Sequence, residues 1–317
     1  MWDKTMKNKP IVGIDVSKEW LDLCIAGNAK VERLENAEEA IGAWLDRVRP
    51  AVVAFEPTGG YERVLVAALR ARGILFVRVH PNDVIAFRKS RGIKAKTDPI
   101  DARLIAAFAA EELVRRGLRP TILGNDLLRA LAARRSQLAS TLHAERCRLG
   151  LAGEKPVRQN LELMIAALRE SLDAIEAEIA KAIDQDPHTA QLAQLLRTVQ
   201  GIGPVTAATL IADLPELGLL SAKEIASLVG LAPNTRQSGK AHARATTAHG
   251  RPHVRQALFN AARAAVRHPS HFKDFADRLV NLNKRPGKVA LTAVMRKILV
   301  TANAIARDRE PWKFHTA

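Results

Sequence analysis

The sequence has little cysteine and no evident export or anchoring segment. Its two cysteines, Cys24 and Cys147, lie far apart, and no Cys/His spacing suits a zinc site. Two lone thiols fit a reducing cytoplasm. Asp15, Lys18 and Glu19 interrupt the first apolar stretch, so no signal peptide is expected, and no apolar run approaches the length of a membrane span. These absences predict a cytoplasmic protein with neither a zinc site nor a membrane anchor.

Acidic residues are scarce relative to basic ones. The 317 residues carry a net charge of +16, and the sequence pI is about 10.3. From Gly230 to the end, 17 Lys and Arg stand against 4 Asp and Glu, so this segment alone carries +13. Such an excess predicts a polyanionic partner, first of all nucleic acid. Because aromatic residues make up only 4% of the chain, we expect phosphate contacts rather than base stacking to dominate binding.

The first 120 residues alternate between short apolar runs and amphipathic patterns. Asn36 is a candidate N-cap for the first amphipathic segment. Alternation of this kind predicts an α/β domain with a central sheet. The expected strands cover 11–15, 20–25, 51–55 and 74–79, and the expected helices cover 36–48, 61–72 and 98–116.

The rest of the chain is predicted to be helical. Long patterns at 126–149 and 161–183 repeat leucine and isoleucine at helical spacing, and 150–156 breaks them, which indicates an antiparallel helical hairpin or coiled coil. It could serve as a spacer or as a dimerisation element. Short helical segments follow, without clear β runs. The expected domains are therefore 1–120, a linker at 121–190 and a basic domain at 191–317.

Carboxylates stand where an α/β domain builds its sites. Asp15 and Glu56 each follow an apolar strand, and strand ends are where ligands bind in such sheets. Asp98 and Asp101 are three residues apart, which places both on one helix face. Hard cations such as Mg²⁺ prefer these oxygen ligands, and two such ions can drive phosphoryl transfer. Helix capping by Asp98 and Asp101, with Pro99 at the first helical position, is an equally direct explanation of that pair.

A glycine-rich turn lies between two helical patterns in the last domain. Gly201 and Gly203 belong to GIGP, the pattern of a helix-hairpin-helix, whose exposed N–H groups contact DNA phosphates without reading sequence. A plain tight turn is the alternative. The basic residues expected to contact nucleic acid are Arg236, Lys240, Arg244, Arg251 and Arg255.

Ser238 lies in a polar turn between Arg236 and Lys240, two residues that could hold a phosphate near its hydroxyl. Serine needs a base or a metal ion to act as a nucleophile, and no Ser/His/Asp arrangement is evident around it. Spacing alone therefore favours an ordinary loop serine.

Five motifs together resemble the DEDD transposases of the IS-one-ten insertion-sequence group, also described as bridge-RNA-guided serine recombinases. The N-terminal motifs are GIDVSK at Gly13, EPTGGYE at Glu56 and KTDPIDARLIA at Lys96; the C-terminal motifs are GIGPVTAATL at Gly201 and GLAPNTRQSG at Gly230. The resemblance covers nearly the whole chain. The sequence departs from the family pattern at Pro57, at Gln200 and within 246–253.

The resemblance implies a fold and a site. The N-terminal domain would be ribonuclease-H-like (RuvC-like), with Asp15, Glu56, Asp98 and Asp101 as an acidic tetrad that binds Mg²⁺. A coiled-coil linker would lead to a mainly helical transposase domain with Ser238 as catalytic serine. The family further implies a homo-oligomer, a dimer or tetramer, whose composite site uses two protomers. It also implies a structured guide RNA, encoded by the element, that pairs with target and donor DNA.

These inferences predict a transposase or site-specific recombinase that cleaves and rejoins DNA through a phosphoserine. The main alternative is a RuvC-like nuclease or junction resolvase, in which the metal site alone hydrolyses DNA and Ser238 has no role. A nucleic-acid-binding protein with an inactive fold is a third possibility, against which the four intact carboxylates argue.

Overall fold

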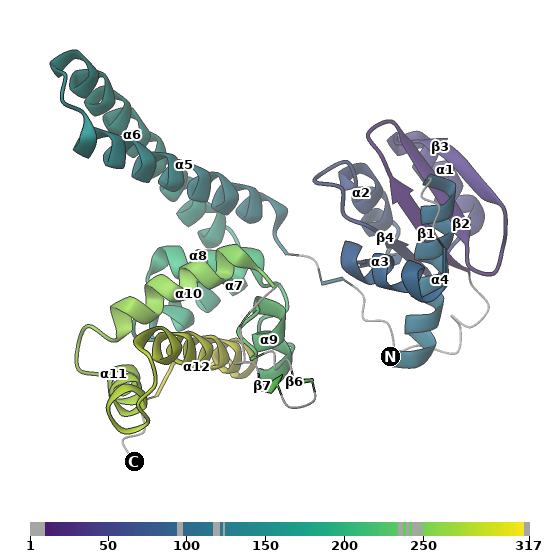
Figure 1. Cartoon of the computed structure of the whole chain (residues 1–317). Coiled ribbons are helices and arrows are strands. Elements are labelled where there is room, and N and C mark those ends of the chain that lie inside the picture. Colours follow the sequence, from purple (N-terminus) through teal and green to yellow (C-terminus); the bar gives the residue numbers. More distant parts are fainter. Residues whose placement is uncertain are drawn as a thin grey trace. The chain divides into compact units, whose positions relative to one another are not determined.

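The computed structural model describes residues 10–93, 98–116, 121–122, 124–233, 237–238, 241–242, 247 and 250–313. The chain divides into two compact units, Met1–Thr121 and Ile122–Ala317. Figure 1 shows a sheet with helices in the first unit and helices almost throughout the second. Each unit has its own core, so each is described by itself.

The first unit is built on a five-stranded mixed sheet of order β3-β2-β1-β4-β5 (Figure 1). β1, β2 and β3 are antiparallel neighbours, whereas β1, β4 and β5 run parallel. This arrangement confirms the predicted α/β class and fits the ribonuclease-H-like fold that the resemblance implies. The strands are β1 (Ile11–Val16), β2 (Trp20–Ile25), β3 (Val31–Glu35), β4 (Val52–Phe55) and β5 (Leu75–Arg78).

Four helices complete the first unit: α1 (Glu38–Val48), α2 (Arg63–Ala71), α3 (Pro81–Ser90) and α4 (Asp98–Arg116). The sequence did not indicate β3 or α3, because β3 alternates weakly and α3 buries only Val84. The predicted N-cap was wrong. Ala37 occupies the cap position of α1 without a side-chain hydrogen bond, and Asn36 Nδ2 instead donates to the carbonyls of Ser17 and Tyr61, each at 2.9 Å.

The second unit begins with the predicted pair of long helices, α5 (Asp126–Leu151) and α6 (Lys155–Asp184), which pack against each other and project from the rest of the unit (Figure 1). Leu138 and Leu142 of α5 and Ile165 of α6 are buried along the hairpin. Near its base, Arg135 Nη2 lies 2.7 Å from a Glu176 carboxylate oxygen. Within the hairpin, residues 152–154 between α5 and α6 are not helical.

Shorter helices form the body of the second unit around α12. Val294, Ile298 and Ala302 of α12 are fully buried in its main core. Asn303 is also buried, and both ends of its amide are satisfied, by Gly218 N and by the Leu220 carbonyl, each at 2.8 Å. The elements are α7 (Pro187–Arg197), α8 (Pro204–Asp213), α9 (Ala222–Val229), β6 (Gln237–Ser238), β7 (Ala241–His242), α10 (Pro252–Ala265), α11 (His271–Asp277), the π-helical turn η2 (Arg278–Leu282) and α12 (Gly287–Asp308).

Within the described residues, α12 is long and apolar enough to cross a membrane by length and composition. Arg296 and Lys297 interrupt its apolar residues, in line with the expectation that no continuous apolar run approaches that length. The structure explains the apolar residues differently, because they form the core on which the neighbouring helices pack.

A basic pair at the α11–α12 contact predicts a pH dependence of stability. Lys297 Nζ is hydrogen-bonded to His271 Nε2. Burial, with the charges of Lys297 and Arg278, lowers the pKa of His271 despite Asp274 nearby. A histidine with a lowered folded-state pKa resists protonation while the unfolded chain accepts it, so stability falls as pH drops below the unfolded value. Urea unfolding at neutral and mildly acidic pH should show a larger loss for wild type than for His271→Gln. Equal losses in both proteins would contradict this prediction.

Candidate functional site

Two of the predicted carboxylates lie side by side at one end of the first unit's sheet. Ile14 of β1 is in parallel register with Phe55 of β4, so Asp15 and Glu56 occupy the next matching positions. Adjacent strands are about 4.8 Å apart, which brings the two backbones within reach of one ligand. Both residues are partly exposed, and both have contacts within the chain. The predicted strand-end placement of these two residues is therefore found in the structure.

A third carboxylate faces Asp15 from the other side but is neutralised within the sheet. Asp22 of β2 is the antiparallel partner of Asp15, and Arg33 of β3 is the partner of Asp22. Arg33 donates to both oxygens of Asp22, from Nε at 2.9 Å and from Nη2 at 2.6 Å, and the Asp22 side chain is 6% exposed. A bidentate pair of this kind fixes the strand register rather than holding a ligand.

Helix α4, which carries the other two predicted carboxylates, lies directly on β1. A Cβ at Gly13 would be 2.2 Å from Ala106 N and 2.6 Å from the Ala102 carbonyl oxygen, so only glycine admits this approach. Asp98 begins α4, one helical turn before Ala102. Asp101, the residue before Ala102, is partly buried.

The side chain of Asp98 lies outside the described residues. Among the side chains that are described, no three or more His, Cys, Asp or Glu lie close enough to hold a metal ion. The structure thus pairs Asp15 with Glu56 and sets α4 against β1. Convergence of all four carboxylates stays a prediction.

Glu62 was not singled out from the sequence, although EPTGGYE ends on it. Its buried carboxylate accepts hydrogen bonds from Gly60 N at 2.9 Å, Thr58 N at 3.3 Å and the Thr58 hydroxyl at 3.4 Å. Burial opposes its ionisation, but backbone N–H groups and the Arg78 charge outweigh burial and lower the pKa of Glu62. An ionised Glu62 therefore holds the loop that begins at Glu56. The sequence signal that could have identified Glu62 is its position as the second glutamate of the glycine-containing EPTGGYE motif.

The segment that carries Ser238 leaves and rejoins the helical body at one point. Gly230 ends α9 in the left-handed conformation, at φ 79°. Gly250, at φ 74°, packs so closely that a Cβ there would be 2.4 Å from Gly230 N. Contact between the two glycines closes the segment into a loop whose ends meet. Within it, β6 and β7 form a short antiparallel hairpin in which Ser238 pairs with Ala241.

The immediate surroundings of the serine hydroxyl lie outside the described residues. This applies to the side chain of Ser238 and to all of Arg236, Lys240 and Arg244. The predicted phosphate contacts of these three basic residues therefore stay predictions.

The other two basic residues predicted to contact nucleic acid, Arg251 and Arg255, form hydrogen bonds within the protein. Arg251 donates to both oxygens of Glu216, at 2.7 and 2.6 Å, and also to the Asp213 carbonyl. Arg255 Nη1 donates to the Val229 carbonyl at 2.9 Å. These bonds tie the start of α10 to the segment after α8 and to the end of α9, beside the Gly230–Gly250 contact. The role of Arg251 and Arg255 in nucleic-acid binding stays a prediction. Their hydrogen bonds show that both residues also connect α10 to neighbouring segments.

The GIGP turn joins α7 to α8, as the sequence predicts. Gly201 has φ 93°, and a Cβ there would be 2.3 Å from the Ala261 carbonyl oxygen, so packing on α10 demands this glycine. Gly203 is the N-cap of α8 and has open space around it, and Pro204 follows at the first helical position. The free N–H groups at this helix start suit an anion.

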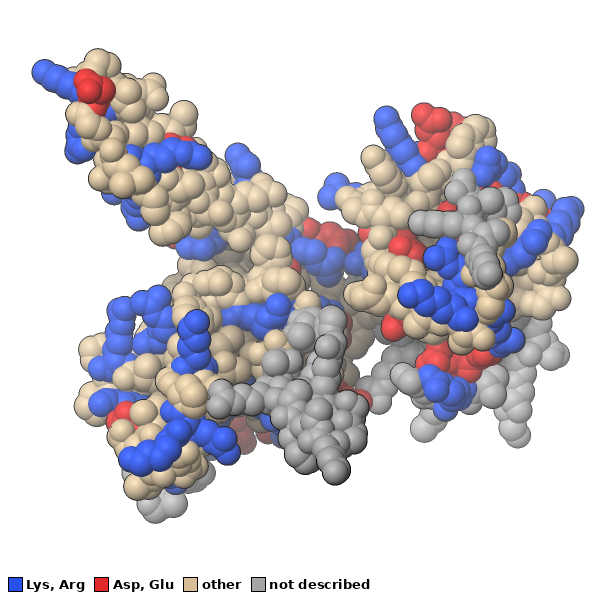
Figure 2. Space-filling view, viewed as in Figure 1, with Lys and Arg blue, Asp and Glu red and all other residues tan. Residues whose placement is uncertain are grey.

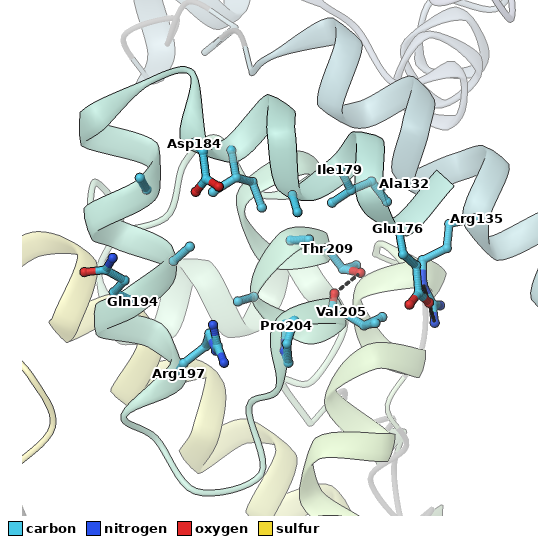
Figure 3. A pocket seen from close by; sticks show the side chains of 16 residues that line it. Ala132, Arg135, Glu176, Ile179, Asp184, Gln194, Arg197, Pro204, Val205 and Thr209 are labelled. Atoms are coloured by element: carbon cyan, nitrogen blue, oxygen red, sulfur yellow. Dashed lines mark hydrogen bonds and ion pairs between the residues drawn. The ribbon is translucent and has the colours of Figure 1, made fainter. Parts of the chain in front are cut away.

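A pocket of about 240 Å³ separates this turn from the base of the α5–α6 hairpin. Figure 3 shows the Arg135–Glu176 pair at one side of the pocket and Arg197 at the other. Alanine and isoleucine side chains form much of the wall, and Thr209 bonds back to the Val205 carbonyl at 2.9 Å. Because Glu176 and Asp184 line the pocket together with Arg135 and Arg197, its lining carries no excess of positive charge that would favour an anion.

Comparison with known families gives two matches. The family described as Transposase IS116/IS110/IS902 matches residues 193–277, and a DEDD family of the IS110 type, described as Transposase, matches residues 12–150. Curated relatives named pilin gene-inverting protein, from Moraxella bovis and Moraxella lacunata, are each 28% identical over 320 residues. Each alignment covers 96% of this chain and 98% of the relative.

Solved structures similar to part of the chain include Thermus thermophilus RuvC. Its complex with a Holliday junction substrate matches at 17% identity, covering 36% of this chain and all of that one, with a TM-score of 0.29. A second structure of the same protein matches at 17% identity, covering 35% of this chain and 99% of that one, with a TM-score of 0.27.

Proposed function

We propose that this chain, which transposase family models match over residues 12–150 and 193–277, is a DNA transposase or recombinase that cleaves and rejoins DNA through a phosphoserine formed on Ser238. The observation that carries the proposal is the placement of Ser238 on the β6–β7 hairpin, in a loop clamped at its base by Gly230 and Gly250. A clamped base lets a loop present one hydroxyl from a fixed support.

In the proposed step, the Ser238 oxygen attacks a DNA phosphorus. An oxygen–phosphorus bond to serine forms, the bond from phosphorus to one deoxyribose oxygen breaks, and that oxygen leaves with a proton. A deoxyribose hydroxyl of another strand then attacks the phosphoserine and releases Ser238. Each step exchanges one phosphate ester for another, so joining needs no outside energy source. Hydrolysis by a metal site alone would discard that energy.

DEDD transposases generally use divalent metal ions, and we propose that Asp15, Glu56, Asp98 and Asp101 of this chain hold Mg²⁺. The adjacent strand ends of Asp15 and Glu56 support the assignment, because hard cations prefer carboxylate oxygens. When bound, the metal would stabilise negative charge on the phosphate under attack. Glu62 and Gly13 would support the ligands, through the loop after β4 and the close approach of α4.

The remaining assignments follow the family. We assign metal-dependent catalysis to residues 1–120, a coiled-coil linker to 121–190 and the serine-bearing domain to 191–317, with the GIGP turn as a helix-hairpin-helix contact to DNA. The partners would be donor DNA, target DNA and a structured guide RNA encoded by the element. The protein would act in the cytoplasm as a dimer or tetramer.

A covalent adduct tests the proposal directly. The full-length protein, purified with its co-expressed RNA, is incubated with Mg²⁺ and a labelled plasmid that carries the gene and its flanking DNA. After denaturation, a protein–DNA species should remain, and digestion should yield a peptide that bears a nucleotide on Ser238. Cleavage without any adduct would support a metal-dependent nuclease instead, and an adduct on another residue would refute Ser238 as the nucleophile.

A further inference from the structure

A basic cavity of about 780 Å³ lies beside the base of the serine-bearing loop. Leu231 and Pro233 line it from the outgoing part of that loop, and Thr247 from the returning part. The opposite side comes from the segment before α12 and from the first turns of α12. That side contributes four cations: Lys284, Arg285, Lys288 and Arg296.

These four cations have no acidic partner among the described residues. Elsewhere in the chain, arginines such as Arg33, Arg135 and Arg251 are paired with carboxylates. Figure 2 shows many Lys and Arg side chains on the helical body of the second unit, with few acidic ones among them. Unpaired cations gathered at a cavity repel one another, and an anionic ligand relieves that repulsion.

Backbone hydrogen bonds fix the segment between η2 and α12, which carries Lys284 and Arg285. After the π-helical turn η2, Asn283 N donates to the Arg278 carbonyl at 3.1 Å and Arg285 N to the Leu279 carbonyl at 3.0 Å. Lys284 between them adopts the left-handed conformation, at φ 50°, which is strained for a residue other than glycine. Pi-helical turns and such strain concentrate at functional sites.

We propose that this cavity binds the phosphate backbone of the DNA strand that enters the serine-bearing loop. This inference rests on the proposed function of Ser238. Phosphate oxygens would meet Lys284, Arg285, Lys288 and Arg296, while the exposed apolar side chains of Pro233 and Val289 would lie against deoxyribose. Contacts of this kind carry no sequence information, so the cavity would position DNA of any sequence next to the loop.

The test removes the four charges from the full-length protein by Lys284→Gln, Arg285→Gln, Lys288→Gln and Arg296→Gln. Binding of a labelled DNA duplex is measured by fluorescence anisotropy over a series of NaCl concentrations. Each lost phosphate contact lowers the log–log salt slope by about 0.9, so the slope should fall by about 2–4 and affinity by about tenfold or more. The matched control removes four exposed cations outside the cavity, at Arg146, Lys155, Arg169 and Lys223, and should keep the slope.

The outcomes separate this inference from the proposed function. A reduced DNA slope supports the cavity even if no adduct forms on Ser238. An unchanged DNA slope overturns it even if the adduct forms normally. A slope reduced only for co-purified RNA, or reduced equally in the control, also overturns it. If the fourfold variant has a lowered unfolding midpoint, the exposed pair Lys284→Gln and Arg285→Gln is titrated alone, with an expected slope change of about 2.

Discussion

Replacing Ser238 by Ala should abolish DNA strand cleavage and leave DNA binding nearly unchanged. The reaction needs the hydroxyl oxygen as the atom that attacks phosphorus, whereas one hydroxyl adds little to a footprint made by a net charge of +16. Loss of a nucleophile typically lowers turnover by several orders of magnitude, about 10⁶-fold in the serine protease in which it was measured. Plasmid cleavage and duplex binding should therefore respond very differently to this one change.

The control for this experiment is Ser171→Ala, which removes an exposed serine on α6 and should cleave normally. Equal unfolding midpoints for the two variants would exclude a folding defect as the cause. If Ser238→Ala cuts the plasmid at the wild-type rate, the carboxylates do the chemistry alone and the nuclease interpretation is correct.

Replacing Gly13 by Ala should destabilise the first unit strongly. The new Cβ would be 2.2 Å from Ala106 N and 2.6 Å from the Ala102 carbonyl oxygen, and these are backbone atoms that no side-chain rotation can clear. Helix α4 would have to move away from β1, and overpacking of this kind costs about 3 kcal/mol or more. Because α4 carries Asp98 and Asp101 and β1 carries Asp15, the same displacement should also lower metal-dependent cleavage.

Denaturant unfolding followed by circular dichroism measures the destabilisation. The matched control is Gly42→Ala in α1 of the same unit, where the new Cβ meets only the movable end of the Arg72 side chain, at 2.8 Å. That substitution should cost less than about 1 kcal/mol, because the guanidinium can shift and alanine favours the helix. A Gly13→Ala protein as stable as wild type would show that α4 does not pack against β1 closely enough to exclude a Cβ at Gly13.

The elements that a short stretch of sequence encodes were predicted correctly, and those without such a local pattern were missed. Asp15 and Glu56 were assigned to strand ends from the apolar runs before them, and both lie there. The long periodic patterns likewise predicted α5 and α6. β3 and α3 escaped prediction because their sequences are polar on most sides: β3 has no fully buried residue, and α3 buries only Val84.

Hydrogen-bond partners distant in sequence were beyond prediction. The sequence marked Arg251 and Arg255 as candidates for contact with nucleic acid and gave no sign of their partners within the protein. In the structure, Arg251 bonds Glu216, 35 residues earlier, and Arg255 bonds the Val229 carbonyl, 26 residues earlier. The positive charge of Lys284, Arg285, Lys288 and Arg296 is evident from the sequence, but the cavity they line with Leu231 and Pro233 is not.

The sequence by itself determined the α/β and helical halves, the hairpin, the basic C-terminal part and the candidate carboxylates and serine. Each of these depends on periodicity, composition or short motifs, which act over a few residues. Only the tertiary structure decided the register that pairs Asp15 with Glu56, the approach of α4 to Gly13 and the closure of the serine loop at Gly230 and Gly250. Such contacts join segments far apart along the chain, and their formation depends on the packing of whole elements, which no local pattern records.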